Sequence, residues 1–315
     1  MKKPIVVLTG PTAVGKTELS IQLAKAIGGE IISADSMQVY KYMDIGSAKI
    51  TPEEMDGVHH YLVDELEPFD EFHVVKFQEY AQKYLNEIYA HEKIPIIAGG
   101  TGFYIQALLN DIDFTEQESD SAYRKELEAL AEEHGNQYLH DRLKEVDPES
   151  AEAIHPNNRK RVIRALEFYQ ETGRKISEHN AKEQMRTSPY NFAYFVLNDE
   201  RSHLYKKIDA RVDKMIEDGL EAEVRRLKEM GCTKDMVAMQ GIGYKEMLSY
   251  LDGGYSLEEA VYIIKRETRH FAKRQITWFK RERDVIWLNK NEFDYKNEAI
   301  LAYMIKILKE KAIIS

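Results

Sequence analysis

GPTAVGKT, residues 10–17, is the stretch that decides the fold. Its spacing, G-x-x-x-x-G-K-T, is that of a phosphate-binding P-loop. We expect the backbone N–H groups of residues 12–17 to point at phosphate oxygens, with a lysine as point charge and a threonine hydroxyl on Mg²⁺. The loop alone indicates a pyrophosphate-like ligand with a metal and leaves open whether that ligand is a nucleotide. The candidate phosphate-binding residues are Gly10, Pro11, Thr12, Ala13, Val14, Gly15, Lys16 and Thr17, the last also being the candidate metal ligand.

The flanking sequence has the pattern that a P-loop requires. Residues 5–8 form a short, mostly β-branched run, which predicts a buried strand, and residues 17–27 carry apolar side chains at helical spacing. Strands alternating with helices predict an α/β fold, namely a P-loop NTPase-like parallel sheet flanked by helices. The further predicted elements are strands at 30–34, 94–98, 191–197 and 284–288 and a helix at 72–90.

The pattern changes after about residue 115. Residues 116–182 show only helical periodicity, interrupted by polar turns and X-Pro pairs. We therefore expect an α/β core formed by residues 1–115 and 189–315. Residues 116–188 would form an all-helical insertion.

Two polar residues follow predicted strands. Asp35 comes directly after the strand at 30–34, and Thr101 lies in a glycine-rich turn after the strand at 94–98. Ligands of parallel sheets collect at the carboxyl ends of the strands, so both residues should line one crevice with the P-loop. Asp35 could hold Mg²⁺ through water, act as a general base or cap a helix. Thr101 could hydrogen-bond a substrate or cap a turn.

The composition fits an ordinary cytoplasmic protein. The chain has 315 residues, one cysteine and a net charge of −10. The single cysteine rules out an internal disulfide, and no apolar run approaches the roughly 20 residues of a membrane span. The apolar stretch near the N-terminus runs straight into the P-loop, so we interpret it as a strand and not as a signal peptide. We expect no membrane association.

The negative net charge hides two basic clusters. Residues 265–283 hold eight Lys/Arg and two acids, whereas the rest of the chain has 36 bases and 52 acids, a net charge of −16. A second cluster lies at residues 157–166. A charge run is often only a solvated helix face, but solvated faces normally mix signs. Two basic clusters therefore favour a polyanionic partner such as a phosphate backbone. Four bases share one helix face in the first cluster: Arg266, Arg269, Lys273 and Lys280.

Seven motifs in order closely resemble the bacterial tRNA dimethylallyltransferases, also called tRNA isopentenyltransferases. The resemblance runs from about residue 4 to residue 288, with Tyr42, Ser47 and Gly241 in place of the family's more usual Gly, Thr and Ala. The motifs are GPTAVGKTELS (10–20), ADSMQVYKYMDIGSAK (34–49), AGGTGFYIQALL (98–109), NNRKRVIRALE (157–167), RVDKMIEDGLEAEV (211–224), MQGIGYKEM (239–247) and TRHFAKRQITWFKRE (268–282).

This resemblance implies a reaction and gives residues roles in it. The P-loop would hold the diphosphate of dimethylallyl diphosphate, and the five-carbon group would pass to N6 of the adenosine 3′ of the anticodon in tRNA. Asp35 would be the base, while Thr101 would position the acceptor and the leaving diphosphate. Lys16, Arg211 and a Mg²⁺ ion at Thr17 would stabilise the charge that grows on diphosphate.

The resemblance also implies how the anticodon stem-loop of tRNA is bound. The target base would leave its stack and meet Gln38, and the helical insertion would be an RNA-binding lobe. Both substrates reach one crevice, so a monomer is the simplest expectation. The implied tRNA-binding residues are Asp35, Ser36, Met37, Gln38, Thr101, Arg159, Lys160, Arg161, Val162, Ile163, Arg164, Arg266, Arg269, Lys273 and Lys280.

Two alternative functions stay open at the level of sequence. An ATP-dependent small-molecule kinase would use the same P-loop but would not need two basic clusters. A nucleotide-gated RNA-binding protein without transferase chemistry would not need Asp35 and Thr101 beside the loop.

Overall fold

The structure is a computed structural model that describes residues 2–112, 122–184 and 186–315. It contains two compact units, Met1–Leu109 with Pro189–Ser315 and Asn110–Ser188. The helical unit begins at Asn110, six residues before the start expected from periodicity. No helix among the described residues is long and apolar enough to cross a membrane.

The first unit is built on a six-stranded sheet in the order β3-β2-β4-β1-β5-β6, in which every pair of neighbours is parallel. Val7 of the central strand pairs with Ile97 on one side and with Tyr194 on the other. The predicted P-loop NTPase-like parallel sheet is thereby confirmed. The strands are β1 (Lys3–Thr9), β2 (Gly29–Ala34), β3 (His60–Tyr61), β4 (Ile94–Gly99), β5 (Tyr190–Asn198) and β6 (Val285–Asn289).

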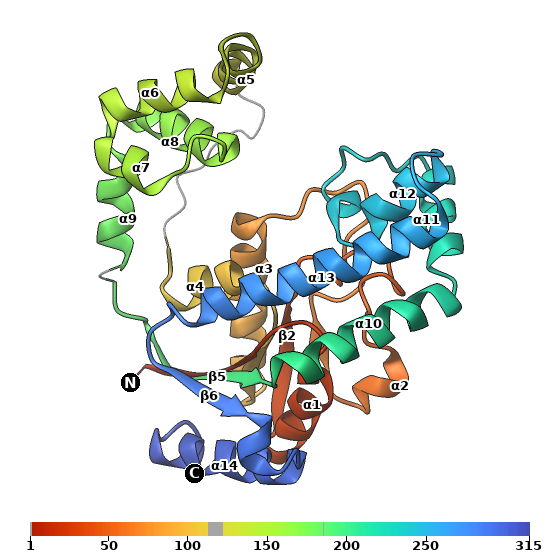
Figure 1. Cartoon of the computed structure of the whole chain (residues 1–315). Helices are drawn as coiled ribbons and strands as arrows, with labels where there is room; N and C mark the ends of the chain where they lie inside the picture. The colour runs from red at the N-terminus through yellow and green to blue at the C-terminus, as the bar shows by residue number, and fades with distance from the viewer. Residues whose placement is uncertain (1, 113–121, 185) are drawn as a thin grey trace. The chain divides into compact units, whose positions relative to one another are not determined.

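Helices cover both faces of the sheet (Figure 1), which explains the continuously apolar strands. Ile5 and Val7 face a core that includes α3 and α4, whereas Val6 and Leu8 face a core that includes α1 and α14. The long helices α10 and α13 pack against each other and contribute to both cores. The helical elements are α1 (Lys16–Ile27), α2 (Pro52–Met55), α3 (Val74–Ala90), α4 (Gly102–Leu109), α10 (Arg201–Glu217), α11 (Leu220–Glu229), η1 (Ala238–Gln240), α12 (Tyr244–Leu251), α13 (Leu257–Phe279), η2 (Lys290–Phe293) and α14 (Asn297–Glu310).

The second unit is helical in its described part and has a core of its own. Its helices are α5 (Ala122–His134), α6 (Asn136–Val146), α7 (Pro148–Ala153), α8 (Arg159–Thr172) and α9 (Ile176–Gln184). The buried carboxylate of Asp147 ties α7 to α9, because it accepts hydrogen bonds from the backbone and hydroxyl groups of Ser150 and Ser177. Arg124 of α5 is joined to Glu167 of α8 by two hydrogen bonds of 3.0 and 2.6 Å.

Candidate active site

A cavity of about 800 Å³ lies in the first unit, where the P-loop, Asp35 and Thr101 come together. The P-loop follows β1, Asp35 follows β2 and Thr101 follows β4, so the three neighbouring strands deliver them to one edge of the sheet. Arg211 reaches the same cavity from α10. Sequence reasoning thus expected one crevice, and the structure brings all four predicted catalytic residues to it: Lys16, Asp35, Thr101 and Arg211.

The backbone of the P-loop depends on two glycines. Gly10 has a φ of 151°, and a Cβ there would lie 2.2 Å from the carbonyl oxygen of Leu197. Gly15 has a φ of 97°, in the region that favours glycine. Five of the eight loop residues line the cavity, whereas the other three are buried behind it. The lining residues are Thr12, Ala13, Gly15, Lys16 and Thr17, and the buried ones are Gly10, Pro11 and Val14.

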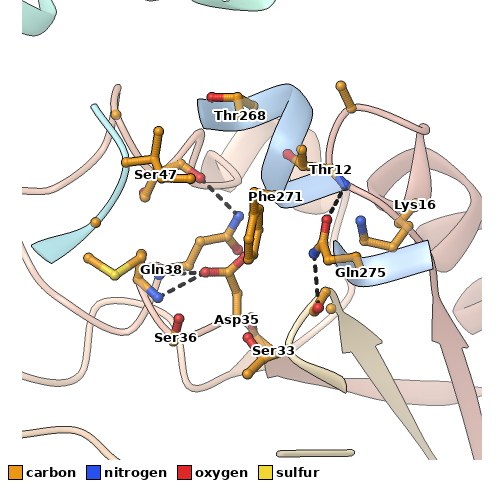
Figure 2. Close-up of a pocket in the computed structure, with 18 of the residues that line it drawn as sticks. Thr12, Lys16, Ser33, Asp35, Ser36, Gln38, Ser47, Thr268, Phe271 and Gln275 are labelled. Atoms are coloured by element: carbon orange, nitrogen blue, oxygen red, sulfur yellow. Dashed lines mark hydrogen bonds between the residues drawn. The ribbon is translucent and has the colours of Figure 1, made fainter. Parts of the chain in front are cut away.

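One feature of the loop corrects the expectation from sequence. The backbone N–H of Thr12 donates to the side-chain oxygen of Gln275, at 2.9 Å, and is therefore not available to phosphate. Figure 2 shows this bond, together with a second bond in which the amide nitrogen of Gln275 donates to the carbonyl oxygen of Gly100, directly after β4. The phosphate contacts of the loop are thus expected from residues 13–17.

Lys16 is folded onto its own loop. Its Nζ donates to the carbonyl oxygens of Gly10 and Pro11, at 3.0 and 2.9 Å. Burial lowers the pKa of Lys16 to about 8, although the Asp35 carboxylate raises it, and the Arg211 guanidinium lowers it further. A bound diphosphate would raise this pKa again, because an opposite charge favours the protonated amine.

The pKa of Lys16 predicts how diphosphate affinity depends on pH. Because Lys16 holds its proton more tightly in the complex than in the free protein, binding is strongest below pH 8. Above pH 8, binding takes up a proton and weakens by up to about tenfold per pH unit. Calorimetric titration with magnesium pyrophosphate, in two buffers of different ionisation enthalpy, measures this uptake. Equal proton uptake by wild type and Lys16→Met would contradict the assignment.

Asp35 is held in place by the turn that follows β2. Its Oδ1 accepts hydrogen bonds from the backbone N–H groups of Met37, at 2.9 Å, and Gln38, at 3.4 Å. No helix begins at this point, so the helix cap considered from sequence is not formed; Asp35 instead stabilises a turn, and it uses one oxygen only. Among the described residues, Oδ2 has no hydrogen-bond partner, so it can accept a proton from a substrate.

The charge of the cavity wall is strongly positive. Among the described lining residues, Asp35 is the only acid, whereas five are lysine or arginine. Lys207 is paired with Asp199, at 2.6 Å, and Lys245 with Glu246, at 3.6 Å. Among the described residues, Lys16, Arg211 and Arg274 line the cavity without an ion pair, so positive charge still exceeds the single carboxylate. Such a wall favours a polyanionic substrate. The five basic residues are Lys16, Lys207, Arg211, Lys245 and Arg274.

The opposite wall is formed by the loop at residues 44–50. Glu223, a buried carboxylate on α11, accepts from the backbone N–H groups of Asp44, Ile45 and Gly46 at 2.8–3.1 Å, and from the hydroxyl of Tyr244 at 2.8 Å. The amide nitrogen of Gln38 donates to the carbonyl oxygen of Ala48 at 3.1 Å and to that of Ser47 at 3.5 Å, the second bond being drawn in Figure 2. The sequence reasoning missed Glu223, since an acid on an amphipathic helix looks like any solvated residue.

The basic residues predicted on α13 lie outside the cavity lining. Arg269 is paired with Asp209 of α10, at 2.5 Å, and its neighbour Lys265 is paired with Asp213 of the same helix. The acids that appeared to be missing from this helix are thus supplied by its packing partner. Arg274 of α13 lines the cavity instead. A tRNA-binding role for Arg266, Arg269, Lys273 and Lys280 stays a prediction.

The basic cluster of the helical unit lies on α8 and needs one correction. Val162 and Ile163, expected to contact tRNA, are buried in the core of this unit and have almost no exposed surface. They are packing residues, since the 3.6-residue period turns them away from their basic neighbours. Contacts from Arg159, Lys160, Arg161 and Arg164 to RNA stay predictions.

The oxygen atoms available at the cavity suit Mg²⁺. The described residues hold no group of three or more His, Cys, Asp or Glu that could bind a metal by itself. Mg²⁺ is commonly bound by one or two protein oxygens together with substrate phosphates and water, and it does not need such a group. Thr17 and Asp35 both line the cavity and offer oxygen ligands only. The residues present therefore fit a magnesium–diphosphate complex.

Fold and site together define a P-loop α/β protein whose cavity is lined, among the described residues, by five basic side chains and one carboxylate. The family model described as IPP transferase matches residues 38–282. The chain belongs to this family, and the resemblance seen in the motifs is confirmed.

Comparisons with individual proteins agree with the family. A tRNA dimethylallyltransferase of Lachnoclostridium phytofermentans is 64% identical over 313 residues, covering 99% of both chains. One from Acetivibrio thermocellus is 52% identical over 296 residues, covering 94% of this chain and 95% of its own. The solved structure of the full-length tRNA isopentenylpyrophosphate transferase from Bacillus halodurans is 45% identical with a TM-score of 0.74, covering 99% of this chain and 98% of its own. A eukaryotic dimethylallyltransferase solved while acting on tRNA is 32% identical with a TM-score of 0.79, covering 91% of this chain and 74% of its own.

Proposed function

We propose that this chain transfers the dimethylallyl group of dimethylallyl diphosphate to N6 of the adenosine 3′ of the anticodon in tRNA, releasing diphosphate. That the chain is a tRNA dimethylallyltransferase follows from its family and from relatives that match it along nearly their whole length. The donor, the target position and the roles of individual residues are the proposal.

The observation that carries the mechanism is the position of Asp35 as the only acid among the described lining residues of a basic cavity. The lone pair of N6 is delocalised into the adenine ring, so the amine is a weak nucleophile and must lose a proton as it attacks. As the N6–C1 bond forms and the allylic C1–O bond breaks, Oδ2 of Asp35 takes the proton and the diphosphate leaves with the electron pair. Thr101, after the neighbouring strand, positions the acceptor and the leaving group.

The leaving diphosphate is stabilised from the P-loop side. Lys16 moves from the carbonyl oxygens of Gly10 and Pro11 to the phosphate oxygens, and Arg211, whose Nη1 lies 3.4 Å from the Thr12 hydroxyl, adds a second charge. Positioned cations at a leaving group lower the barrier because charge grows there in the transition state. Thr17 would hold Mg²⁺, which when bound neutralises part of the diphosphate charge.

The target adenine must flip out of its stack in the anticodon loop, because a stacked base cannot enter the cavity and bring N6 to Asp35. Ser36, Met37 and Gln38 line the cavity next to Asp35 and would contact the flipped adenine. Lys245 and Arg274, which also line the cavity, would meet the phosphates beside it. Action as a monomer and a cytoplasmic location stay predictions.

Label transfer to RNA tests the proposal. The protein is incubated with Mg²⁺, dimethylallyl diphosphate labelled in its allyl group and an unmodified anticodon stem-loop. Label should enter the RNA, and a matched stem-loop with inosine in place of the target adenosine should stay unlabelled, because inosine lacks the N6 amine. A parallel reaction contains ATP and small acceptors in place of dimethylallyl diphosphate. Hydrolysis of ATP or phosphorylation of an acceptor there, with no label in RNA in the first reaction, would show that the loop holds a nucleotide.

A further inference from the structure

Gln275 occupies a place on α13 where a core residue is expected. It lies on the buried face of the helix with Ile264, Ala272 and Phe279, and it is only 6% exposed. A buried amide is costly unless both of its polar atoms are hydrogen-bonded. Both are: Oε1 accepts from the backbone N–H of Thr12 and Nε2 donates to the carbonyl oxygen of Gly100, each at 2.9 Å.

These two bonds join the two halves of the cavity. Thr12 belongs to the P-loop after β1, while Gly100 precedes Thr101 in the turn after β4 (Figure 2). The N–H of Thr101 in turn donates to the carbonyl oxygen of Ala34, at 3.1 Å, directly before Asp35. A continuous chain of hydrogen bonds therefore runs from the diphosphate loop through Gln275 to the segments that carry Thr101 and Asp35.

The two hydrogen bonds of Gln275, which we call the Gln275 bridge, suit a side-chain amide. Oε1 must accept from the N–H of Thr12 and Nε2 must donate to the carbonyl oxygen of Gly100, which fixes the orientation of the Gln275 amide. A carboxylate could only accept, and a thioether could do neither effectively. The turn at Gly100 also leaves no room for a larger residue beside the Gln275 amide, because a Cβ at Gly100 would lie 2.3 Å from Nε2. The turn is thus shaped around this side chain.

We propose that Gln275 is a positioning residue that sets the spacing between the diphosphate loop and the acceptor side of the cavity. The inference rests on the proposed function, because the spacing matters only where a donor on one loop reacts with an acceptor on the other. In-line attack requires the reacting atoms to approach to roughly 3–3.5 Å, and a misplacement of about 1 Å can cost 10²-fold in rate. Gln275 lines the cavity, but both of its polar atoms are used by the backbone bonds to Thr12 and Gly100, so its role is to position these segments.

Gln275→Met tests the inference, because methionine has nearly the same shape and makes neither bond. We expect kcat for prenyl transfer to fall by about 10- to 100-fold, while KM for dimethylallyl diphosphate stays within about threefold. Gln106→Met is the matched control: Gln106 lies outside the cavity lining and its amide bonds Glu282, at 3.3 Å. It should keep the wild-type kcat. A kcat of Gln275→Met within about threefold of wild type would overturn the inference, and so would a loss confined to KM.

Gln275→Glu is a second variant, which tests the inference even if Gln275→Met folds poorly. A neutral glutamic acid can accept on one oxygen and donate from the other, as the amide does, but the ionised form cannot donate. The kcat of Gln275→Glu relative to wild type should therefore rise as the pH falls from about 8 to about 5.5. A ratio that is flat or falls over this range would contradict the bridge. Wild type without any transfer would refute the proposed function instead.

Discussion

Asp35→Asn should lower kcat for prenyl transfer by about 10²- to 10⁴-fold, the range expected when a general base is removed. Asparagine keeps a side-chain oxygen for the backbone N–H groups of Met37 and Gln38, which bond Oδ1 in the wild type. The turn after β2 is therefore retained, and only the oxygen that accepts the proton is lost. Single-turnover transfer of labelled dimethylallyl to a stem-loop RNA measures the effect.

Asp35→Ala is the companion variant that separates chemistry from structure. It loses the base and also the two hydrogen bonds of the turn, so it should be as slow as Asp35→Asn but less stable, by about 1 kcal/mol for the lost turn hydrogen bonds. RNA binding by Asp35→Asn, measured by gel retardation, should stay close to wild type. If Asp35→Asn transferred label at the wild-type rate, another group would have to take the N6 proton.

Lys16→Met should lower kcat by about 10²- to 10³-fold, because it removes a positioned cation from the side on which diphosphate leaves. The effect should be larger in kcat than in KM for the donor, since charge on the diphosphate grows in the transition state. The wild-type advantage in kcat/KM should shrink above pH 8, where the free enzyme loses the Lys16 proton. Steady-state kinetics between about pH 7 and pH 9.5 would show both effects.

Lys25→Met is the matched control for this prediction. It removes the same kind of cation from the same helix, α1, but from an exposed ion pair with Asp56 that lies outside the cavity lining. Exposed ion pairs contribute little, so kcat should change less than about twofold. If both lysine variants lost activity equally, net charge and not the position of Lys16 would be responsible.

Much of this architecture could be predicted because the local patterns are strong. The P-loop has its strand and helix on either side, and the rule that parallel strands deliver ligands to their carboxyl ends brought Asp35 and Thr101 to the same cavity. The two-residue strand β3 was missed because a pair such as His60–Tyr61 shows no periodicity.

The residues that organise the cavity were harder to see, because their roles depend on tertiary contacts. Gln275 and Glu223 act through hydrogen bonds to backbone groups that lie 175–263 residues away. For Gln275 a signal did exist, namely a glutamine on the buried face of an amphipathic helix. The charge pattern of α13 was incomplete by itself, since Asp209 and Asp213, which pair with Arg269 and Lys265, come from a different helix.

In the proposed reaction, the P-loop holds the diphosphate of an allylic donor. The most direct test uses dimethylallyl diphosphate labelled in both the allyl group and the diphosphate, with a stem-loop RNA that is digested to nucleosides after reaction. We expect one released diphosphate for each N6-dimethylallyladenosine, with no ATP required. ATP-dependent phosphorylation without allyl label in the nucleosides would contradict it.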